Sequence, residues 1–191
     1  MMRCLVFYGS YRSDRAGIAV AEHIRDKVSE EGHDVELIDA KEYDFGILDK
    51  MYKEFDGDAP EKMKELSEKI EEAESFILIS GEYNHSIQPG LSNLLDHFQQ
   101  EFIFKPSAIV AYSPSQFGGA RAAMQLRAFM PELGSISIPS ILYYPASHKL
   151  SDQLSDPETK KGIDERFSRF IKELSWYSDA LSAKRNEGTP Y

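Results

Sequence analysis

The sequence predicts an α/β protein built on a parallel β-sheet with helices on both faces. Five short apolar segments, typical of strands buried on both sides, alternate along the 191 residues with amphipathic segments. The amphipathic segments repeat their apolar residues at spacings of three and four, as one face of a helix does. Strands that alternate with helices form parallel sheets through crossover connections, and a chain of this length suits one domain over residues 1–191.

The first strand is predicted over residues 4–8, an apolar run that stops at Gly9. The helix after it has its apolar face at Gly17, Ala21, Ile24 and Val28. Gly32 follows at the place where a glycine commonly ends a helix. A second strand is predicted over 35–38.

A long acidic and aromatic connection spans residues 39–59, and we expect a short helical turn near Leu48. Pro60 marks the start of the next helix, because proline fits the first turn of a helix. The apolar face of that helix consists of Met63, Leu66, Ile70 and Ala73. The third strand, over 75–80, is the most hydrophobic, so we expect it at the centre of the sheet.

The second half of the chain continues the alternation with a helix whose apolar residues are Leu91, Leu94, Leu95 and Phe98. A strand over 107–112, a helix over 120–130 and a strand over 136–144 follow. The final helix begins at Asp156 and Pro157, which are a favoured N-cap and a favoured first helical residue. We expect its apolar face to pack on the sheet or on a partner; that face consists of Ile163, Phe167, Phe170, Ile171, Leu174, Tyr177 and Leu181.

Right-handed crossovers leave few arrangements for such a sheet. Five strands in a chain of this length favour the doubly wound, flavodoxin-like strand order 2-1-3-4-5. In that order ligands bind beyond the carboxyl ends of the strands, at the switch point between the first and third strands. The candidate binding loops are therefore 9–17, 81–90 and 113–119.

Composition excludes several classes of function. The 22 Lys and Arg residues against 32 Asp and Glu residues give a formal net charge of −10, which disfavours nucleic acids and anionic membranes as partners. Cys4 is the single cysteine, and His85 and His97 match no common zinc spacing, so we predict no metal site. No signal-peptide pattern and no apolar run of transmembrane length are present, which predicts a cytoplasmic protein.

Residues 9–17 lead into a helix N-terminus, where unpaired backbone N–H groups and the helix dipole favour an anion. Ser10 and Ser13 add hydroxyl donors, and Arg12 and Arg15 add guanidinium groups suited to phosphate oxygens. The spacing matches neither the dinucleotide-binding nor the triphosphate-binding glycine motif, so a single terminal phosphate fits best. An ordinary strand–helix turn with surface arginines is the alternative.

The other two loops carry polar groups suited to a flat heteroaromatic ring. Tyr83, Asn84 and Ser86 follow the third strand and offer an aromatic wall, an amide and a hydroxyl. Gly118 and Gly119 follow the fourth strand and let a ligand approach the backbone. Each loop alone is also consistent with a surface turn, but three such loops at strand ends favour a ligand site.

Three segments resemble the signature segments of the NADPH-dependent FMN reductase family, a flavodoxin-like group that includes quinone, azo and chromate reductases. They read GSYRSDRAG, GEYNHSIQPGLSNLLDHF and SQFGGARAAMQLR, and the resemblance extends over essentially the whole chain. It implies bound FMN, NADPH as electron donor, and transfer of two electrons to a quinone-like, azo or metal-oxyanion acceptor or to free flavin. It also implies a homodimer or homotetramer.

By this resemblance the FMN phosphate is held by Ser10, Arg12 and Arg15, while Gly17 lets the following helix pack closely. The isoalloxazine ring would lie against the other two loops, chiefly against backbone groups, at Glu82, Tyr83, Asn84, Ser86, Ser113, Gln116 and Gly118. The chemistry would belong to the cofactor, so no catalytic residue is predicted. His85 lies beside the ring site and is a candidate proton donor to an acceptor.

Two alternatives stay open. A flavodoxin-type electron carrier would bind FMN without turning over NAD(P)H, but the arginines of residues 9–17 are atypical of a flavodoxin phosphate loop. A regulatory or scaffold protein on the same fold is the other alternative, because a fold by itself does not determine function.

Overall fold

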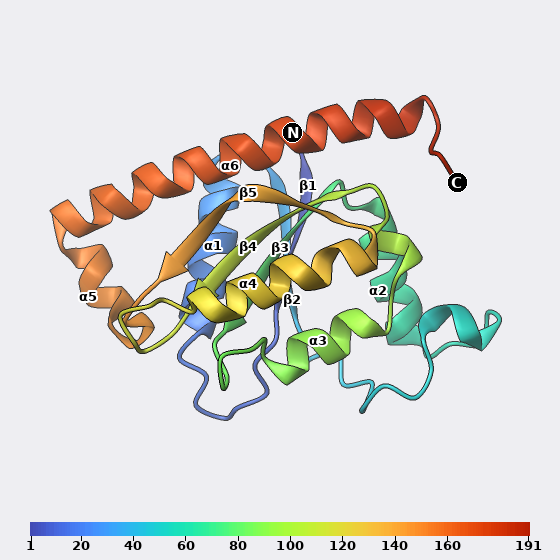
Figure 1. Cartoon of the computed structure of the whole chain (residues 1–191), viewed down its shortest axis with the longest axis horizontal. Coiled ribbons are helices and arrows are strands. Elements are labelled where there is room, and N and C mark those ends of the chain that lie inside the picture. Colours follow the sequence, from blue (N-terminus) through green and yellow to red (C-terminus); the bar gives the residue numbers. More distant parts are fainter.

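The computed structural model describes residues 1–191 and contains one parallel sheet with the strand order β2-β1-β3-β4-β5 (Figure 1). Its strands are β1 (Arg3–Tyr8), β2 (Asp34–Asp39), β3 (Ser75–Gly81), β4 (Pro106–Tyr112) and β5 (Ile136–Tyr144). The predicted flavodoxin-like topology is therefore confirmed, and so is the central place of β3. Val6 of β1 lies between Leu37 of β2 and Ile77 of β3, which sets the register at the middle of the sheet.

Helices cover both faces of the sheet. They are α1 (Ile18–Glu30), α2 (Glu61–Glu72), α3 (Pro89–Asp96), α4 (Ala120–Phe129), α5 (Leu150–Ser155) and α6 (Pro157–Asn186). Because strand side chains alternate, Val6 and Tyr8 point to one face and Leu5 and Phe7 to the other. α1 and α6 pack on the first face, and α2, α3 and α4 pack on the second, each through a cluster of 22 buried apolar residues (Figure 1).

The final helix, α6, runs for 30 residues across one face of the molecule (Figure 1). Asp156 is its N-cap, and the Asp156 carboxylate accepts a hydrogen bond from the N–H of Thr159 at 2.9 Å, as the sequence predicts. Phe167 and Phe170 are buried in the same cluster as the β4 residue Val110. The apolar face of α6 therefore packs on the sheet. None of the helices, α6 included, is long and apolar enough to cross a membrane.

The connection between β2 and α2 differs from the prediction. The expected helical turn near Leu48 is wrong, because the turn forms later, as the 3-10 helix η1 (Tyr52–Phe55). The side-chain oxygen of Asn93 in α3 accepts the N–H of Leu48 at 2.9 Å, and the Asn93 amide donates to the carbonyl of Gly46 at 2.7 Å. These two bonds occupy the backbone groups that a turn at this position would use.

The aromatic residues of this connection pack on the core of the protein itself. The ring of Phe45 lies 5.3 Å from that of His97 and 6.2 Å from that of Phe98, and Tyr52 lies 6.0 Å from Phe98. Two aliphatic residues of this segment stay exposed: Ile47 with 91% of its surface and Leu48 with 39%. The aromatic residues of this connection therefore pack within one chain.

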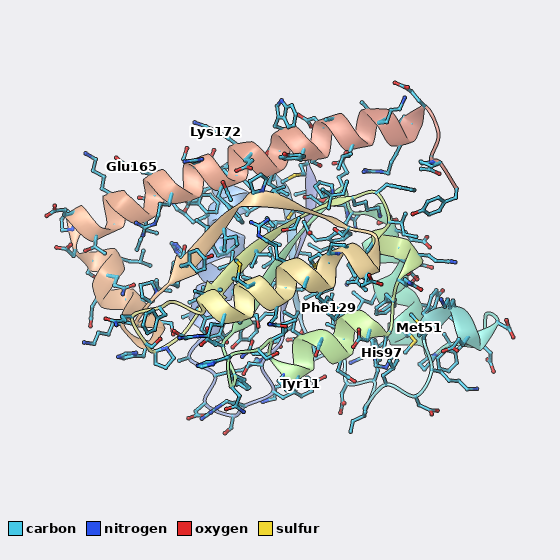
Figure 2. All side chains as sticks on the ribbon, in the orientation of Figure 1. Tyr11, Met51, His97, Phe129, Glu165 and Lys172 are labelled. Atoms are coloured by element: carbon cyan, nitrogen blue, oxygen red, sulfur yellow. The ribbon has the colours of Figure 1, made fainter.

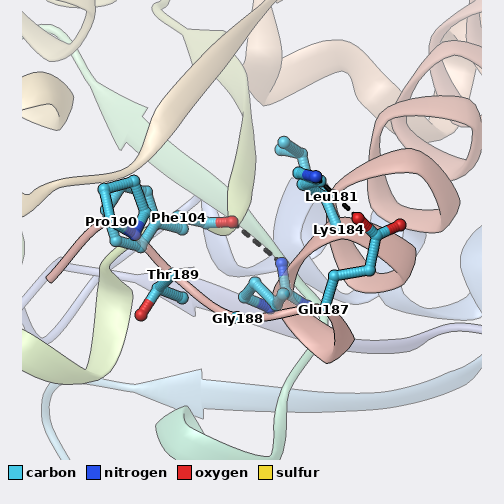
Figure 3. Close-up of a pocket in the computed structure, with 8 residues that line it drawn as sticks. Phe104, Leu181, Lys184, Glu187, Gly188, Thr189 and Pro190 are labelled. Carbon is cyan, nitrogen blue, oxygen red and sulfur yellow. Dashed lines mark hydrogen bonds and ion pairs between the residues drawn. The ribbon is translucent and has the colours of Figure 1, made fainter.

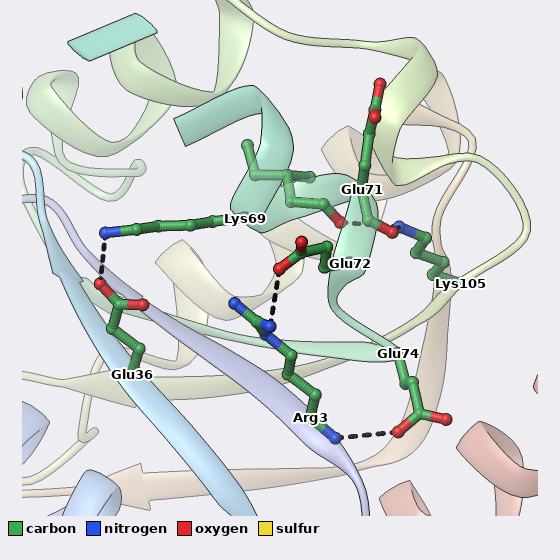
Figure 4. Close-up of polar contacts among 8 residues, drawn as sticks. Arg3, Glu36, Lys69, Glu71, Glu72, Glu74 and Lys105 are labelled. Carbon is green, nitrogen blue, oxygen red and sulfur yellow. Dashed lines mark hydrogen bonds and ion pairs between the residues drawn. The ribbon is translucent and has the colours of Figure 1, made fainter. Parts of the chain in front are cut away.

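Ion pairs and contacts to a helix end lie at the end of the sheet opposite the candidate loops (Figure 4). Arg3 pairs with Glu72 at 2.6 Å, and Lys69 pairs with Glu36 at 2.6 Å. The buried Lys105 donates from its Nζ to the carbonyls of Ile70 and Glu71, both at 2.6 Å. Lys105 thereby satisfies carbonyl groups in the last turn of α2, which have no partner within the helix.

Candidate functional site

Three loops meet beyond the carboxyl ends of β1, β3 and β4. The hydroxyls of Ser10 and Tyr83 lie 3.3 Å apart and join the first loop to the second. The N–H of Glu82 donates to the carbonyl of Tyr112 at 3.2 Å and joins the second loop to the end of β4. The structure thus brings these loops together at the predicted switch point between β1 and β3.

The first loop presents a run of unpaired donors. None of the backbone N–H groups of residues 10–15 donates to an acceptor within the chain. Ser10 is buried, with 2% of its surface exposed, whereas Arg12 and Ser13 are exposed. The loop leads directly into α1, so the partial positive charge of a helix N-terminus adds to these donors. This donor set fits a phosphate group.

The two arginines of the loop occupy different environments. Arg15 donates from Nη1 to Asp39 Oδ1 at 2.6 Å and to the carbonyl of Ser10 at 3.3 Å, and the Asp39 side chain is almost buried. Arg12 and Asp14 form an exposed pair at 3.2 Å, and the hydrogen bond from Arg12 lowers the pKa of Asp14. Arg12 can therefore turn to an anion without leaving a buried charge alone, while Arg15 is tied to the fold.

Glycines let the loop approach its neighbours. A Cβ at Gly17 would overlap the ring and hydroxyl of Tyr112, so the start of α1 lies against this tyrosine only because residue 17 has no side chain. A Cβ at Gly90 would overlap the ring of Tyr11. Figure 2 shows Tyr11 beside the start of α3, where this contact occurs.

The second loop turns tightly between Tyr83 and Ser86, whose N–H and carbonyl groups pair in both directions at 3.1 and 2.9 Å. The central residues Asn84 and His85 have φ angles of 50° and 64°, in the left-handed region. Asparagine and histidine adopt this conformation more often than most other residues, although it costs energy for any residue with a side chain. The side chains of Asn84, His85 and Ser86 are exposed, and the N–H groups of Asn84 and His85 have no acceptor in the chain.

The carboxylate of Glu82 is already used within the protein. It accepts the N–H of Arg121 at 3.0 Å and the Arg121 guanidinium at 3.3 Å, and so caps the first turn of α4. The guanidinium also lies 5.2 Å from the ring centre of Phe117. Glu82 therefore fixes the third loop relative to the second.

The third loop is built around buried Ser113 and two glycines. Ser113 donates its N–H to the carbonyl of Tyr144 at 3.3 Å, and its hydroxyl lies 2.9 Å from that of Ser115. Gly118 and Gly119 have φ angles of 59° and 83°, and a Cβ at Gly119 would lie 2.8 Å from backbone atoms of Tyr112. Gln116 is exposed.

The structure adds three residues that the sequence analysis does not single out. Gln88 is fully buried and donates from its side-chain nitrogen to the hydroxyl of Tyr112 at 2.9 Å, and Tyr112 donates to the hydroxyl of Tyr8 at 3.4 Å. Burial raises the pKa of both tyrosines, which stay protonated. Tyr8 and Tyr112 end two predicted strands, and a polar residue before Pro89 is the one signal in the sequence that could have drawn attention to Gln88.

Two cavities lie on different sides of the fold. One, of about 510 Å³, adjoins the first loop and is bordered by Tyr11, Ile47, Gly90 and Asn93. The other, of about 420 Å³, is bordered by Phe104 and by the segment after α6 (Figure 3). Arg185 donates to the carbonyl of Phe104 at 2.8 Å beside this second cavity. Because Phe104 lies just before β4, this cavity is at the end of the sheet where the strands begin, opposite the candidate loops.

The family model and the curated relatives indicate one family, and the solved structure shows the same fold. The model of the NADPH-dependent FMN reductase family matches residues 2–149. The NADH:(hydroxy)cinnamate reductase subunit CrdA of Vibrio ruber is 30% identical over 74% of this chain and 75% of its own length. The NADPH azoreductase of Bacillus sp. strain OY1-2 is 25% identical over 92% of both chains. The structure of FerB, a flavoenzyme NAD(P)H:(acceptor) oxidoreductase from Paracoccus denitrificans, has a TM-score of 0.73 at 20% identity, and covers 93% of this chain and 99% of its own.

Proposed function

The chain belongs to the NADPH-dependent FMN reductase family, and on that premise we propose that it is an FMN-binding NAD(P)H oxidoreductase. It would take two electrons from NADPH and pass them to a quinone-like, azo or metal-oxyanion acceptor or to free flavin. Bound FMN would supply the two-electron chemistry, and the protein would supply binding and orientation. The flavodoxin-type electron carrier is the second candidate, and turnover of NADPH separates the two.

The observation that carries the proposal is the run of unpaired N–H groups over residues 10–15, directly before α1. We assign the FMN phosphate to this run, together with the hydroxyl of Ser10 and the guanidinium of Arg12. Arg15 contributes by holding the carbonyl of Ser10, and Gly17 contributes by letting α1 start close to β4. The local donors offset the formal net charge of −10, which opposes binding of any anion.

We assign the ring of the flavin to the edge formed by the second and third loops. The N–H groups of Asn84 and His85 are donors for the ring, beside Tyr83 and Ser86. Ser113, Gln116 and Gly118 line the opposite edge. N–H groups aimed at the ring stabilise negative charge that develops on it. Glu82 serves by fixing the two loops to each other, since its carboxylate is engaged with Arg121.

The imidazole of His85 is exposed and would be within reach of an acceptor above the ring. We retain His85 as a candidate proton donor to the acceptor. A homodimer or homotetramer and a cytoplasmic location stay predictions from the sequence. Light scattering at micromolar concentration would test the first, and a monomeric mass would contradict it.

Steady-state turnover tests the proposed function. Purified protein is mixed with FMN, NADPH or NADH, and in turn a benzoquinone, an azo dye, chromate or free flavin, and oxidation of the nicotinamide is followed. We expect FMN-dependent oxidation with at least one acceptor. FMN binding without oxidation of either nicotinamide would support the electron carrier instead, and the absence of FMN binding would contradict both functions.

A further inference from the structure

Three buried side chains form a hydrogen-bonded row beneath the candidate loops. Gln88 Nε2 lies 2.9 Å from the Tyr112 hydroxyl, which lies 3.4 Å from the Tyr8 hydroxyl. Gln88 and Tyr8 have no exposed surface, and Tyr112 has 7%. These residues come from the end of the second loop, the end of β4 and the end of β1, so the row connects three separate segments.

Tyr112 also touches the backbone of the loops themselves. Its ring and hydroxyl occupy the space that a side chain at Gly17 would need, and a Cβ at Gly81 would lie 2.8 Å from its ring. Its carbonyl accepts the N–H of Glu82, and its backbone lies against Gly119. A rotation of the Tyr112 ring would therefore disturb the start of α1 and the end of β3 together.

Gln88 determines which group donates and which accepts in each hydrogen bond of the row. Its amide nitrogen donates to Tyr112, which leaves the Tyr112 proton to be donated to Tyr8. The side-chain oxygen of Gln88 is buried and has no partner, and its own N–H donates to the hydroxyl of Ser80. A buried polar atom without a partner destabilises a fold, so an apolar residue would be more favourable here if packing were its purpose. The hydrogen bond that Gln88 donates to Tyr112 explains why an amide, and not an apolar side chain, is present at this position.

We propose that Gln88 and Tyr112 are positioning residues for the phosphate loop. By locking Tyr8 they hold the end of β1, two residues before Ser10, so that the hydroxyl of Ser10 stays beside Tyr83 and the unpaired N–H groups of residues 10–15 keep their arrangement. The inference rests on the proposed function for the identity of the anion. The order that the row imposes on the loop is a property of the free protein.

The free protein is tested first, by hydrogen–deuterium exchange of Tyr112→Phe, Gln88→Leu and Tyr8→Phe. Tyr144→Phe is the matched control, because Tyr144 is a buried tyrosine paired with Tyr112 in the sheet register and its hydroxyl makes no hydrogen bond within the chain. The probes are the hydrogen-bonded amides beside the loop: the N–H of Ala16, which donates to Asp14, that of Ile18, which donates to Arg15, and that of Ala40, which donates to Tyr8. We expect their exchange to become about tenfold faster in each of the three variants and to be unchanged in Tyr144→Phe. Unchanged exchange in Tyr112→Phe and Tyr8→Phe would overturn the proposal.

Flavin affinity provides the second readout. Riboflavin carries the same ring as FMN without the phosphate, so a displaced phosphate loop lowers the affinity for FMN alone. We expect Tyr112→Phe and Gln88→Leu to lower FMN affinity about tenfold and riboflavin affinity less than twofold, and the double variant to be no worse than either single one. Equal losses for both ligands would overturn the positioning role. If the unmodified protein binds no FMN while the variants show the expected differences in exchange, the proposed function is refuted and the loop-ordering role stands.

Discussion

Arg15 and Asp39 form a mostly buried ion pair at 2.6 Å that ties the loop after β1 to the end of β2. The same Nη1 atom of Arg15 donates to the carbonyl of Ser10. One arginine therefore shapes the loop from inside the fold. Arg12, three residues earlier, pairs only with the exposed Asp14 and is available to a ligand. The sequence alone does not distinguish the two arginines, but in the structure Arg15 is held within the fold and Arg12 is exposed.

Replacement of Arg15 by alanine is expected to destabilise the protein. It leaves the carboxylate of Asp39 almost buried without its partner, which should lower the free energy of unfolding by about 2 kcal/mol; loss of one partner of a fully buried pair costs about 3–5 kcal/mol. Urea denaturation measures the change. The double variant Arg15→Ala, Asp39→Asn should recover part of the loss. A loss no larger than that of Arg12→Ala would contradict the structural role of Arg15.

Replacement of Arg12 by alanine is expected to act on ligand binding. FMN affinity should fall about tenfold, the size of one charge-assisted hydrogen bond, while riboflavin affinity stays within twofold. Fluorescence titration of the two flavins measures both constants. Arg25→Ala is the matched control, since Arg25 is partly exposed, with 38% of its side-chain surface accessible, and is paired with the neighbouring Asp26. This variant should bind both flavins normally. Equal losses for FMN and riboflavin would remove the phosphate role of Arg12.

Two glycine-to-alanine variants should shift stability in opposite directions. Gly17→Ala forces a Cβ into the ring of Tyr112 and should lower the free energy of unfolding by about 1–3 kcal/mol. Gly162→Ala lies within α6, where the new Cβ would meet only Arg166 Nη1 at 3.6 Å, and should raise it by about 0.5–1 kcal/mol. Calorimetry measures both, and a single transition would support one domain over residues 1–191. A neutral Gly17→Ala would show that α1 can move away from Tyr112.

Lys105 predicts a rise of stability with pH. Burial, with a smaller effect of Arg185, lowers the pKa of Lys105 from 10.5 to about 8, while Glu71 and Glu101 oppose the shift. Between these values the unfolded chain binds more protons than the folded one, so the contribution of Lys105 to stability is present above pH 10.5 and is lost as the pH falls to about 8.

The comparison variant for this prediction is Lys105→Met, because buried tyrosines also titrate at high pH. The difference in unfolding free energy, wild type minus Lys105→Met, should rise between pH 8 and 10.5 by up to about 1.4 kcal/mol per pH unit. Parallel curves for the two proteins would show that the Lys105 ammonium keeps its ordinary pKa in the fold.

The elements that the sequence predicts well are those whose signal is local. The signals for the apolar run at β3, for the N-cap at Asp156 and for Gly32 after α1 each depend only on neighbouring residues. The turn expected near Leu48 forms elsewhere because Asn93, distant in sequence, binds that backbone. α5 is missed because it buries one apolar side chain, Leu150, and so has no apolar stripe.

The same distinction between local and long-range signals applies to the candidate site. Loops at strand ends follow from topology, so the sequence predicts that the loops containing Ser10 and Tyr83 lie close together. The pairing of Arg15 with Asp39 and the bond from Gln88 to Tyr112 join residues 24 positions apart, and no periodicity records such a bond. Buried polar contacts of this kind depend on the final packing, which only the structure supplies.

The proposed reductase activity is tested most directly by an absorbance spectrum of the protein with FMN, recorded without oxygen before and after addition of NADPH. We expect flavin bands that comigrate with the protein and bleach rapidly when NADPH is added, with recovery when a quinone follows. Flavin bands that persist in the presence of both NADPH and NADH would contradict the reductase and favour an electron carrier. Failure of the protein to retain any FMN would contradict the phosphate site at residues 10–15.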